Sequence, residues 1–403
     1  MSASEYQTEP HFDIHASVVL QLGESLITDV AQALVELVKN SYDADATYAK
    51  VVVDTKAKPG KLSSYQNATG YISIEDDGIG MDEDTIRQGW LTISNSPKRD
   101  MKRFGLMTER GRTPLGDKGL GRLCAQRLAF NVEIFTRPKG SPVEYHVAFS
   151  WNSFNDRNIT LTQIPVIFEK ISPPLRTSGT KLIISDLRDV EAWDARAVSD
   201  LEIRLSQLIS PYKEVENFIV AAVVDGKRLE LAEYSEQVKK AASVHYRLDF
   251  NGKEFHIKGK IKLDFFKPDD DAEKQEFREL VESDRGSRFF EYLSNKRQAE
   301  RFHLKKSQEE DWYLELDYNS LLAVIDKVRT LTDGKPANPG QFYGEIDYIK
   351  LVSDGSGSGS RYLGGTSTLR KFVRDLGGIR VFRDGFGVRV DSDWLGLGKQ
   401  QPT

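Results

Sequence analysis

Cysteine is almost absent from this chain, because Cys124 is the single one among 403 residues. One thiol can form neither an intramolecular disulfide nor a cysteine-cluster metal site. Long apolar runs are missing too: the longest clean one is Phe218–Val224, whereas a membrane-spanning helix needs roughly 20 apolar residues. Residues 1–13 lack the charged-then-apolar layout of a signal peptide. We therefore expect a soluble, cytoplasmic protein that does not enter a membrane.

An excess of charge of one sign is also lacking, since 56 Lys and Arg stand against 61 Asp and Glu, a net charge of −5. This balance argues against nucleic-acid or anionic-membrane binding by the whole surface, but it allows a local basic patch. Apolar residues make up 39% of the chain, which over this length is enough for sizeable cores. With roughly 100–200 residues per domain as the usual range, two domains are expected.

Apolar periodicity predicts that helices alternate with a mixed sheet in the first half of the chain. Val30, Leu34, Leu37 and Val38 recur at three-to-four spacing, as on the buried face of a helix. The expected helices are 16–46, 82–91 and 120–130, and the expected strands are 48–54, 71–75, 131–136, 143–150, 157–164 and 180–186. Residues 94–118 form a long, polar, glycine-punctuated loop, and loops of that length are uncommon unless they act as lids or are disordered.

The second half offers weaker signals. The stretch 186–194 is the expected domain boundary, and the step Asn251-Gly252 between alternating runs predicts a hairpin. Helices are expected at 195–209, 277–306 and 318–332, and a strand, turn and strand at 378–390. Residues 353–360 (SDGSGSGS) have the composition of a flexible linker, either native or engineered in place of a loop.

The first pattern with chemical content is ALVELVKNSYDADAT, on the expected first helix. Glu36, Asn40 and Asp43 are spaced i, i+4 and i+7, so they share one helix face, opposite the apolar one. A carboxylate could act as a base that activates water, and a carboxamide one turn away could offer an oxygen to Mg²⁺. Taken alone, this pattern is more often the solvated face of an ordinary amphipathic helix.

The second pattern, EDDGIGM, follows the expected strand at 71–75. Glycines such as Gly78 and Gly80 let the backbone approach a flat ligand closely. A buried carboxylate beside them could accept a hydrogen bond from an exocyclic amine such as that of adenine. In isolation, an acidic turn after a strand is the commoner explanation.

Two further patterns bound the long loop. NSPK places Ser96 and Lys98 at its start, where a lysine is a phosphate partner or, more often, only a surface residue. GDKGLGR, residues 116–122, opens a helix, and glycines at a helix N-terminus present N–H groups and a positive dipole end to phosphate. The chain contains neither a Walker loop nor a G-x-G-x-x-G dinucleotide pattern. A glycine-rich loop alone is therefore weak support for nucleotide binding.

Together, in this order and spacing, the four patterns resemble the GHKL ATPases, the superfamily of gyrase, ninety-kilodalton heat-shock chaperones, histidine kinases and MutL. ELVKNSYDADA is similar to the N box, EDDGIGM to the first glycine box and GDKGLGR to the second, over roughly residues 20–185. DADAT resembles the MutL, topoisomerase and microrchidia branch, and NSPKR looks most like microrchidia (MORC) ATPases. The resemblance implies an α+β fold, with a Bergerat-type ATP-binding α/β sandwich at 1–190 and a ribosomal-S5-like transducer domain at 191–403.

Carried over by position, the resemblance implies that Glu36 polarises the attacking water, Asn40 binds Mg²⁺ and Asp76 receives the adenine amino group. A mobile lid would span about 92–118. Gly80 would lie against adenine, and Gly119 and Gly121 would wrap the phosphates. The other implied nucleotide-binding positions are Asp43, Gly78, Met81, Ser96, Lys98, Gly116, Lys118, Leu120 and Thr180. In the family, the second domain supplies a lysine or arginine to the γ-phosphate, and Lys399 is the candidate here.

The expected function is thus Mg²⁺-dependent ATP hydrolysis in which ATP closes the lid and drives homodimerisation. Such a clamp commonly acts on DNA, so DNA or a protein is the further partner, and ATP and Mg²⁺ are the cofactors. One alternative is a chaperone cycle on protein clients, although these 403 residues lack a large client-binding domain. Another is a nucleotide-sensing dimerisation module with little turnover, against which Glu36 speaks.

A basic and aromatic stretch, residues 285–306, leaves two interpretations open. Interleaved Arg, Lys and aromatic residues could contact a phosphate backbone. Acidic residues follow at 309–311, and a solvated, salt-bridged helix is the commoner outcome of such a charge pattern.

Overall fold

A computed structural model shows the chain as two compact units. The first comprises Met1–Ala232 and Gly378–Thr403, and the second comprises Glu233–Gly377. The structure describes residues 13–26, 29–93, 95, 97–116, 121–156, 158–209, 218–231, 239–268, 271–282, 284–321, 340–350, 358–363, 381–383 and 386–387. Among these residues, no helix is both long and apolar enough to cross a membrane.

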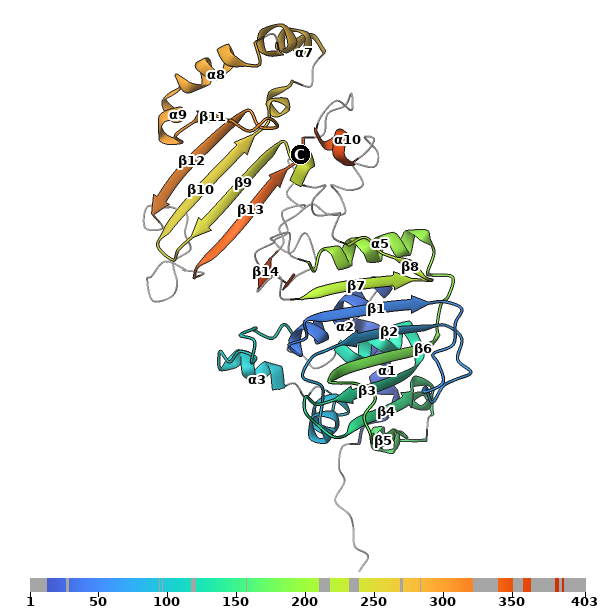
Figure 1. Ribbon diagram of the computed structural model, residues 1–403. Coiled ribbons are helices and arrows are strands. Elements are labelled where there is room, and N and C mark those ends of the chain that lie inside the picture. Colours follow the sequence, from blue (N-terminus) through green and yellow to red (C-terminus); the bar gives the residue numbers. More distant parts are fainter. Residues whose placement is uncertain are drawn as a thin grey trace, which may run out of the picture. The chain divides into compact units, whose positions relative to one another are not determined.

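The first unit is built on an eight-stranded sheet with the order β5-β4-β3-β6-β2-β1-β7-β8 (Figure 1). The strands are β1 Tyr48–Asp54, β2 Tyr71–Asp76, β3 Ala129–Arg137, β4 Glu144–Ser150, β5 Ile167–Ile171, β6 Gly179–Leu187, β7 Ile219–Val224 and β8 Lys227–Arg228. Neighbouring strands are antiparallel except β1 and β7, which are parallel. The sheet is therefore mixed, as the sequence predicts.

Helices cover one face of this sheet, and α1 and α2 lie behind the strands in the view of Figure 1. The main ones are α1 Ser17–Leu26, α2 Val30–Asp43, α4 Ala125–Leu128 and α5 Ala195–Ser206. Shorter elements are η1 Thr85–Trp90, α3 Pro97–Arg103, η2 Gly121–Cys124, η3 Trp151–Asn155 and η4 Leu161–Gln163. Asp29 caps α2 by accepting a hydrogen bond from the Gln32 amide at 2.8 Å. In the apolar stripe of α2, Leu34, Leu37 and Val38 are buried and Val30 is partly buried, and the helix packs on β1 and β2 as its periodicity predicts.

Three local predictions in this unit need correction. The expected helix 16–46 is two helices, α1 and α2, and the expected helix 120–130 ends at Leu128 because β3 begins at Ala129. The strand expected at 157–164 is wrong. There Thr160 and Gln163 form a capping box around the short helix η4, and the strand β5 comes later, at Ile167–Ile171.

The boundary between the compact units also differs from the predicted division at 190/191. Strand β7, beyond that point, pairs with β1 from Tyr48↔Ile219 to Val53↔Val224, which joins it to the first unit. The C-terminal segment returns to the same unit: Phe386 is 1% exposed and stacks on Tyr42 with ring centroids 4.5 Å apart. A local charge and turn pattern cannot reveal such long-range strand pairing.

The second unit contains an antiparallel five-stranded sheet with the order β11-β12-β10-β9-β13. Its strands are β9 Val244–Phe250, β10 Glu254–Ile261, β11 Lys305–Lys306, β12 Leu314–Leu321 and β13 Phe342–Tyr348. Its helical elements are η5 Leu263–Phe266, α7 Asp271–Phe277, η6 Arg278–Glu282, α8 Ser287–Ser294, α9 Arg297–Arg301 and α10 Ser358–Leu363. Aromatic residues of η5 and α8 pack against Val244, Ile261 and Leu314 in its core.

The hairpin predicted at Asn251-Gly252 is confirmed, since it joins β9 to β10. The helix predicted at 318–332 is wrong over 318–321, which belong to β12, and the remainder lies outside the described residues. The helix predicted at 277–306 is broken into the end of α7, η6, α8 and α9, and it is wrong over 305–306, which form β11. Two short paired strands, β14 Phe382–Arg383 and β15 Phe386–Gly387, lie where a strand, turn and strand were expected.

A buried acid and histidine connect the centre of the first sheet to a loop. Glu133 on β3 is fully buried and accepts hydrogen bonds from the Ser63 hydroxyl and, at 2.6 Å, from the Ser64 amide. His146 on β4 lies 3.3 Å from Glu133 and 3.2 Å from Glu169. Burial opposes the charged imidazolium, but the hydrogen bonds and charges of the two glutamates outweigh it and hold the pKa of His146 above its ordinary value.

We predict that His146→Gln destabilises the first unit more at low pH than at high pH. A raised folded-state pKa gives stabilisation that is complete below the unfolded value, about 6.5, and that is lost as pH rises through the folded value. The expected cost is roughly 1–3 kcal/mol at pH 5.5 and less at pH 9, measured by urea unfolding. His15→Gln, on a histidine that contacts Ser17, is the control. A cost of His146→Gln that is independent of pH would contradict the ion-pair interpretation.

Candidate functional site

The residue at the centre of the candidate site is Asp76, the last residue of β2. Its Oδ2 accepts a hydrogen bond from the Ser41 hydroxyl on α2 at 2.8 Å. Its Oδ1 accepts from the backbone amides of Gly78 at 3.0 Å and Thr180 at 3.1 Å. The carboxylate therefore connects α2, β2 and β6. These contacts fix its orientation, which a group that recognises a ligand requires.

Burial sets the electrostatics of Asp76, which is 7% exposed. Desolvation raises the pKa of Asp76 above its ordinary value, while hydrogen bonds from Ser41, Gly78 and Thr180 oppose the shift by stabilising the carboxylate. A buried carboxyl group with remaining acceptor capacity is suited to recognise an N–H donor of a ligand.

The other two acids of this motif are used differently. The Glu75 carboxylate lies 3.4 Å from the ammonium of Lys181 on β6. Asp77 accepts hydrogen bonds from the amide of Thr47 at 2.7 Å and from its hydroxyl at 2.5 Å, so it fixes the entry to β1. Asp76 is thus the buried one of the three acids, and it is the acid to which the family resemblance assigns the adenine contact.

The glycines of the first glycine box are required by the protein's own backbone. A Cβ at Gly78 would lie 2.5 Å from the Ala44 carbonyl oxygen, and one at Gly80 would lie 2.0 Å from the Arg137 carbonyl oxygen. Gly80 also has a φ of +68°, which side-chain-bearing residues rarely adopt. These contacts hold the box between α2 and β3, beside Asp76.

Thr136, on β3, is a residue that the sequence reasoning missed. Its hydroxyl accepts the Met81 amide at 2.9 Å and lies 3.0 Å from the hydroxyl of Thr180. The side chain is fully buried, so the predicted residues Met81 and Thr180 meet through it. No local motif marks Thr136, since a threonine inside a strand is common for packing reasons.

Glu36 lies on α2 and is half-buried, whereas Asn40, one turn later, is exposed. One carboxylate oxygen of Glu36 accepts hydrogen bonds from Lys39 Nζ at 2.9 Å and from Gln32 Nε2 at 3.1 Å. The sequence reasoning did not single out Lys39. Lys39 and Gln32 therefore occupy the same oxygen of Glu36.

Asp43, the last residue of α2, holds both ends of the predicted lid. It forms a 2.8 Å ion pair with Lys98 on α3, and its own side chain is 1% exposed. It also accepts the amides of Leu115 at 2.7 Å and Gly116 at 3.0 Å. The predicted residues Asp43, Lys98 and Gly116 are therefore brought together.

Arg112 anchors the lid to the end of the same helix and was also missed. Its guanidinium donates hydrogen bonds to the carbonyl oxygens of Tyr42 at 2.9 Å and Ala46 at 2.8 Å. It also lies 4.5 Å from the centroid of the Tyr42 ring. Arg112 is only 2% exposed, and its hydrogen bonds satisfy carbonyl groups at the C-terminus of α2. These contacts hold residues 108–116 against the helix. The predicted mobile lid thus has a fixed anchor.

The second glycine box is described only in part. Gly121 begins η2, which packs against α2, and Cys124 is buried there, as expected of a small core residue. Burial and the charge of Glu36 raise the pKa of Cys124 to about 12. The predicted contacts that lie outside the described residues are Ser96, Lys118, Gly119, Leu120 and Lys399.

An apolar cavity of about 220 Å³ borders the helix η2. It is lined mainly by aliphatic and aromatic side chains, among them Leu123, Trp90 and Trp151. Such a lining offers no charged group to a phosphate or a metal ion. The polar contacts for a nucleotide are therefore expected around Asp76 and along α2 instead.

Comparison with known families agrees with this geometry. Residues 27–175 match the family model described as histidine kinase-, DNA gyrase B- and HSP90-like ATPase. The match supports a GHKL-type ATPase domain. It spans α2, Asp76, the lid segment and η2, and it ends before Thr180. ATP binding and hydrolysis are the general activity of this superfamily, and the mixed sheet with its helices is consistent with the fold.

We predict that Asp43→Ala releases the end of the lid. The Leu115 and Gly116 amides would lose their shared acceptor, at a cost of roughly 1–3 kcal/mol, or about 10–100-fold faster hydrogen exchange. Exchange measured by NMR or mass spectrometry checks this, with the amides of β1 as an internal control for global unfolding. Lys98→Met should accelerate exchange less, because the amide acceptor remains. Unchanged protection in Asp43→Ala would show that the lid is anchored by other contacts.

Proposed function

We propose that this protein is a Mg²⁺-dependent ATPase of the microrchidia-like or MutL-like kind, whose nucleotide gates a homodimeric clamp that acts on DNA. The observation that carries the proposal is Asp76, a buried carboxylate held by Ser41, Gly78 and Thr180 at the junction of α2, β2 and β6. Its remaining acceptor capacity is complementary to the amino group of adenine.

The catalytic assignment rests on α2. Glu36 is the proposed base that polarises the attacking water, and Asn40, one turn later and exposed, offers the proposed Mg²⁺ ligand. An exposed amide oxygen fits this ion, which takes few protein ligands together with phosphates and waters. When bound, Mg²⁺ neutralises phosphate charge, while α2 keeps Glu36 and Asn40 at a fixed spacing.

The lid provides the proposed link between nucleotide and assembly. Lys98 forms an ion pair with Asp43, and the γ-phosphate of ATP would offer its ammonium a more highly charged partner. Exchange of that partner would reorganise α3 and the residues near Gly116 together, because Asp43 contacts both. We propose that this reorganisation creates the surface on which a second copy docks, and that the second unit acts as the S5-like transducer.

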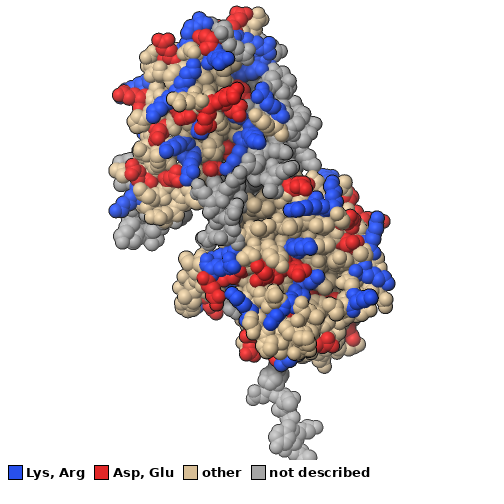
Figure 2. Space-filling view, in the orientation of Figure 1, with Lys and Arg blue, Asp and Glu red and all other residues tan. Residues whose placement is uncertain are grey.

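The choice between DNA and a protein partner has weaker support. Arg297, Arg301, Lys305 and Lys306 on α9 and β11 are exposed. On the face of the second unit drawn in Figure 2, however, basic and acidic side chains are interleaved and do not form a basic stripe. Any DNA contact would therefore depend on a local cluster and be sensitive to salt.

One observation favours a second candidate, a nucleotide-sensing module with little turnover. The Lys39 ammonium lies 2.9 Å from the same Glu36 oxygen that also accepts from Gln32. A water that used this oxygen would have to displace both donors. If Lys39 stays on Glu36 when ATP binds, the protein would bind and dimerise while hydrolysing very slowly.

We predict that Asp76→Asn weakens ATP binding by roughly 10–100-fold or more, the range for a lost hydrogen bond to a charged group. Isothermal titration with a non-hydrolysable ATP analogue measures the loss. Asp77→Asn is the matched control, because the adjacent acid contacts Thr47 and should leave affinity nearly unchanged. Equal affinities of Asp76→Asn and the parent protein would refute the adenine contact.

We predict that Glu36→Ala binds ATP but loses turnover by about 10²–10⁴-fold, the usual contribution of a general base. Steady-state ATP hydrolysis by the parent protein and by Glu36→Ala, each with and without duplex DNA, is the test, with a reaction without protein as the blank. Stimulation by DNA supports the clamp, and stimulation by unfolded protein instead supports a chaperone cycle. In the low-turnover alternative, Lys39→Met should raise the rate, since it frees the base. A Glu36→Ala variant that hydrolyses normally removes Glu36 from the mechanism.

A further inference from the structure

Three side chains that commonly bind metal ions gather on one face of the sheet in the second unit. His245 on β9 is paired directly with Asp347 on β13, so their side chains share a face. Glu345 precedes Asp347 by two residues on the same strand, which places it on that face as well. Strand register alone therefore brings one imidazole and two carboxylates together.

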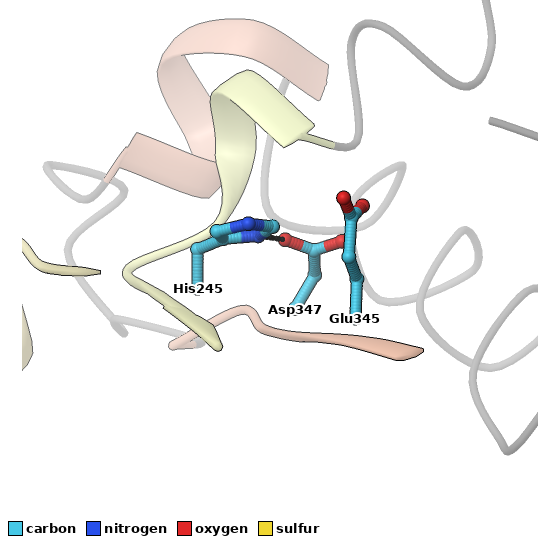
Figure 3. A group of neighbouring side chains, drawn as sticks. All are labelled: His245, Glu345 and Asp347. Carbon is cyan, nitrogen blue, oxygen red and sulfur yellow. Dashed lines mark hydrogen bonds and ion pairs between the residues drawn. The ribbon is translucent and has the colours of Figure 1, made fainter. Parts of the chain in front are cut away.

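Figure 3 shows Asp347 between His245 and Glu345, with its carboxylate directed at the imidazole. His245 Nδ1 lies 2.8 Å from Asp347 Oδ1, and one ligand atom from each of the three residues lies within 4.8 Å of the others. The side chains of His245, Asp347 and Glu345 are 23%, 20% and 13% exposed. Solvent can therefore reach the group, although most of its surface is protein-lined.

From this geometry we propose that His245, Glu345 and Asp347 form a binding site for a divalent transition-metal ion of the Zn²⁺ type. One nitrogen and two carboxylate oxygens are a donor set that Zn²⁺ accepts, whereas Mg²⁺ and Ca²⁺ prefer oxygen ligands only. Tetrahedral bonds of about 2.0–2.1 Å place ligand atoms about 3.3 Å apart. To reach this spacing, the 2.8 Å distance between His245 Nδ1 and Asp347 Oδ1 has to increase slightly. Rotation of the Glu345 side chain would bring its carboxylate oxygen closer to these two atoms. Water completes the coordination.

Lys239 gives the site a competing cation. Its ammonium lies 2.9 Å from Oε2 of Glu345, the carboxylate that completes the proposed ligand set. A metal ion must displace this ion pair, and it must also take the place of any proton on His245 Nδ1. Removing the Lys239 charge should therefore strengthen metal binding. If Lys239 instead supported the site, its removal would weaken metal binding.

The same sheet contains a matched pair that lacks the third ligand. His256 Nε2 on β10 lies 2.7 Å from Asp317 Oδ1 on β12, a diagonal cross-strand contact, since His256 is paired directly with Asn319. Among the described residues, only the group around His245 brings three such ligands together. His256 is therefore a control for non-specific binding of metal by exposed histidines.

The test is titration of the intact, nucleotide-free protein with Zn²⁺ by calorimetry and with Co²⁺ by visible absorption. We expect one Zn²⁺ per chain and a Co²⁺ spectrum typical of nitrogen and oxygen ligands. His245→Ala and Glu345→Gln should each weaken Zn²⁺ binding at least about 10-fold. Lys239→Met should tighten it several-fold, and His256→Ala should leave it unchanged.

Circular dichroism of each variant shows whether the sheet is intact. Lys239→Met keeps the proposal testable even if a ligand variant fails to fold. Equal Zn²⁺ affinity of the parent and a folded His245→Ala variant would overturn the site. An equal loss in His256→Ala would also overturn it, as would weaker binding by Lys239→Met.

Discussion

The arrangement of the first unit depends on two carboxylates buried beside the last turn of α2. Asp43 and Asp76 are each 7% exposed, and an unpaired buried charge would cost several kcal/mol. Each is satisfied by donors from distant segments: lid amides and Lys98 for Asp43, and Ser41, Gly78 and Thr180 for Asp76. Satisfying these two groups brings the lid, the glycine box and β6 to the same end of one helix.

The sequence was most informative where a motif is local. The apolar stripe of α2 and the Asn251-Gly252 hairpin could be predicted because neighbouring residues determine them. The family resemblance singled out Asp76 among Glu75, Asp76 and Asp77 by its position two residues before Gly78, and Asp76 is the buried one of the three. The family resemblance rested on such local runs, and the matched segment 27–175 includes the runs that resemble the N box and the two glycine boxes.

Prediction from sequence failed where contacts between distant parts of the chain determine the structure. Thr136 and Arg112 become site residues only because β3 and the lid fold back on the first glycine box and on α2. The domain boundary was misplaced because β7 pairs with β1 across some 170 residues, and nothing in the local composition at 190 signals this. The expected helix at 318–321 became part of β12, since cross-strand pairing with β10 overrides a weak helical pattern.

The contacts of α2 also constrain how a nucleotide could act on the rest of the unit. One rigid helix carries Glu36, Asn40 and Asp43 on successive turns. A ligand that changes the partner of Asp43 therefore acts about one helical turn away from Asn40. Arg112 and Phe386 pack on Tyr42 next to Asp43, which couples the lid anchor to the returning C-terminal segment. Arg112 is buried and tied to two backbone carbonyls of the α2 end. The helix α3 contacts Asp43 through the ion pair of Lys98, and its Lys102 ammonium donates to the Leu115 carbonyl at 2.6 Å, within the lid itself. A phosphate that attracts Lys98 would therefore act on α3 and, through Lys102, on the lid near Leu115.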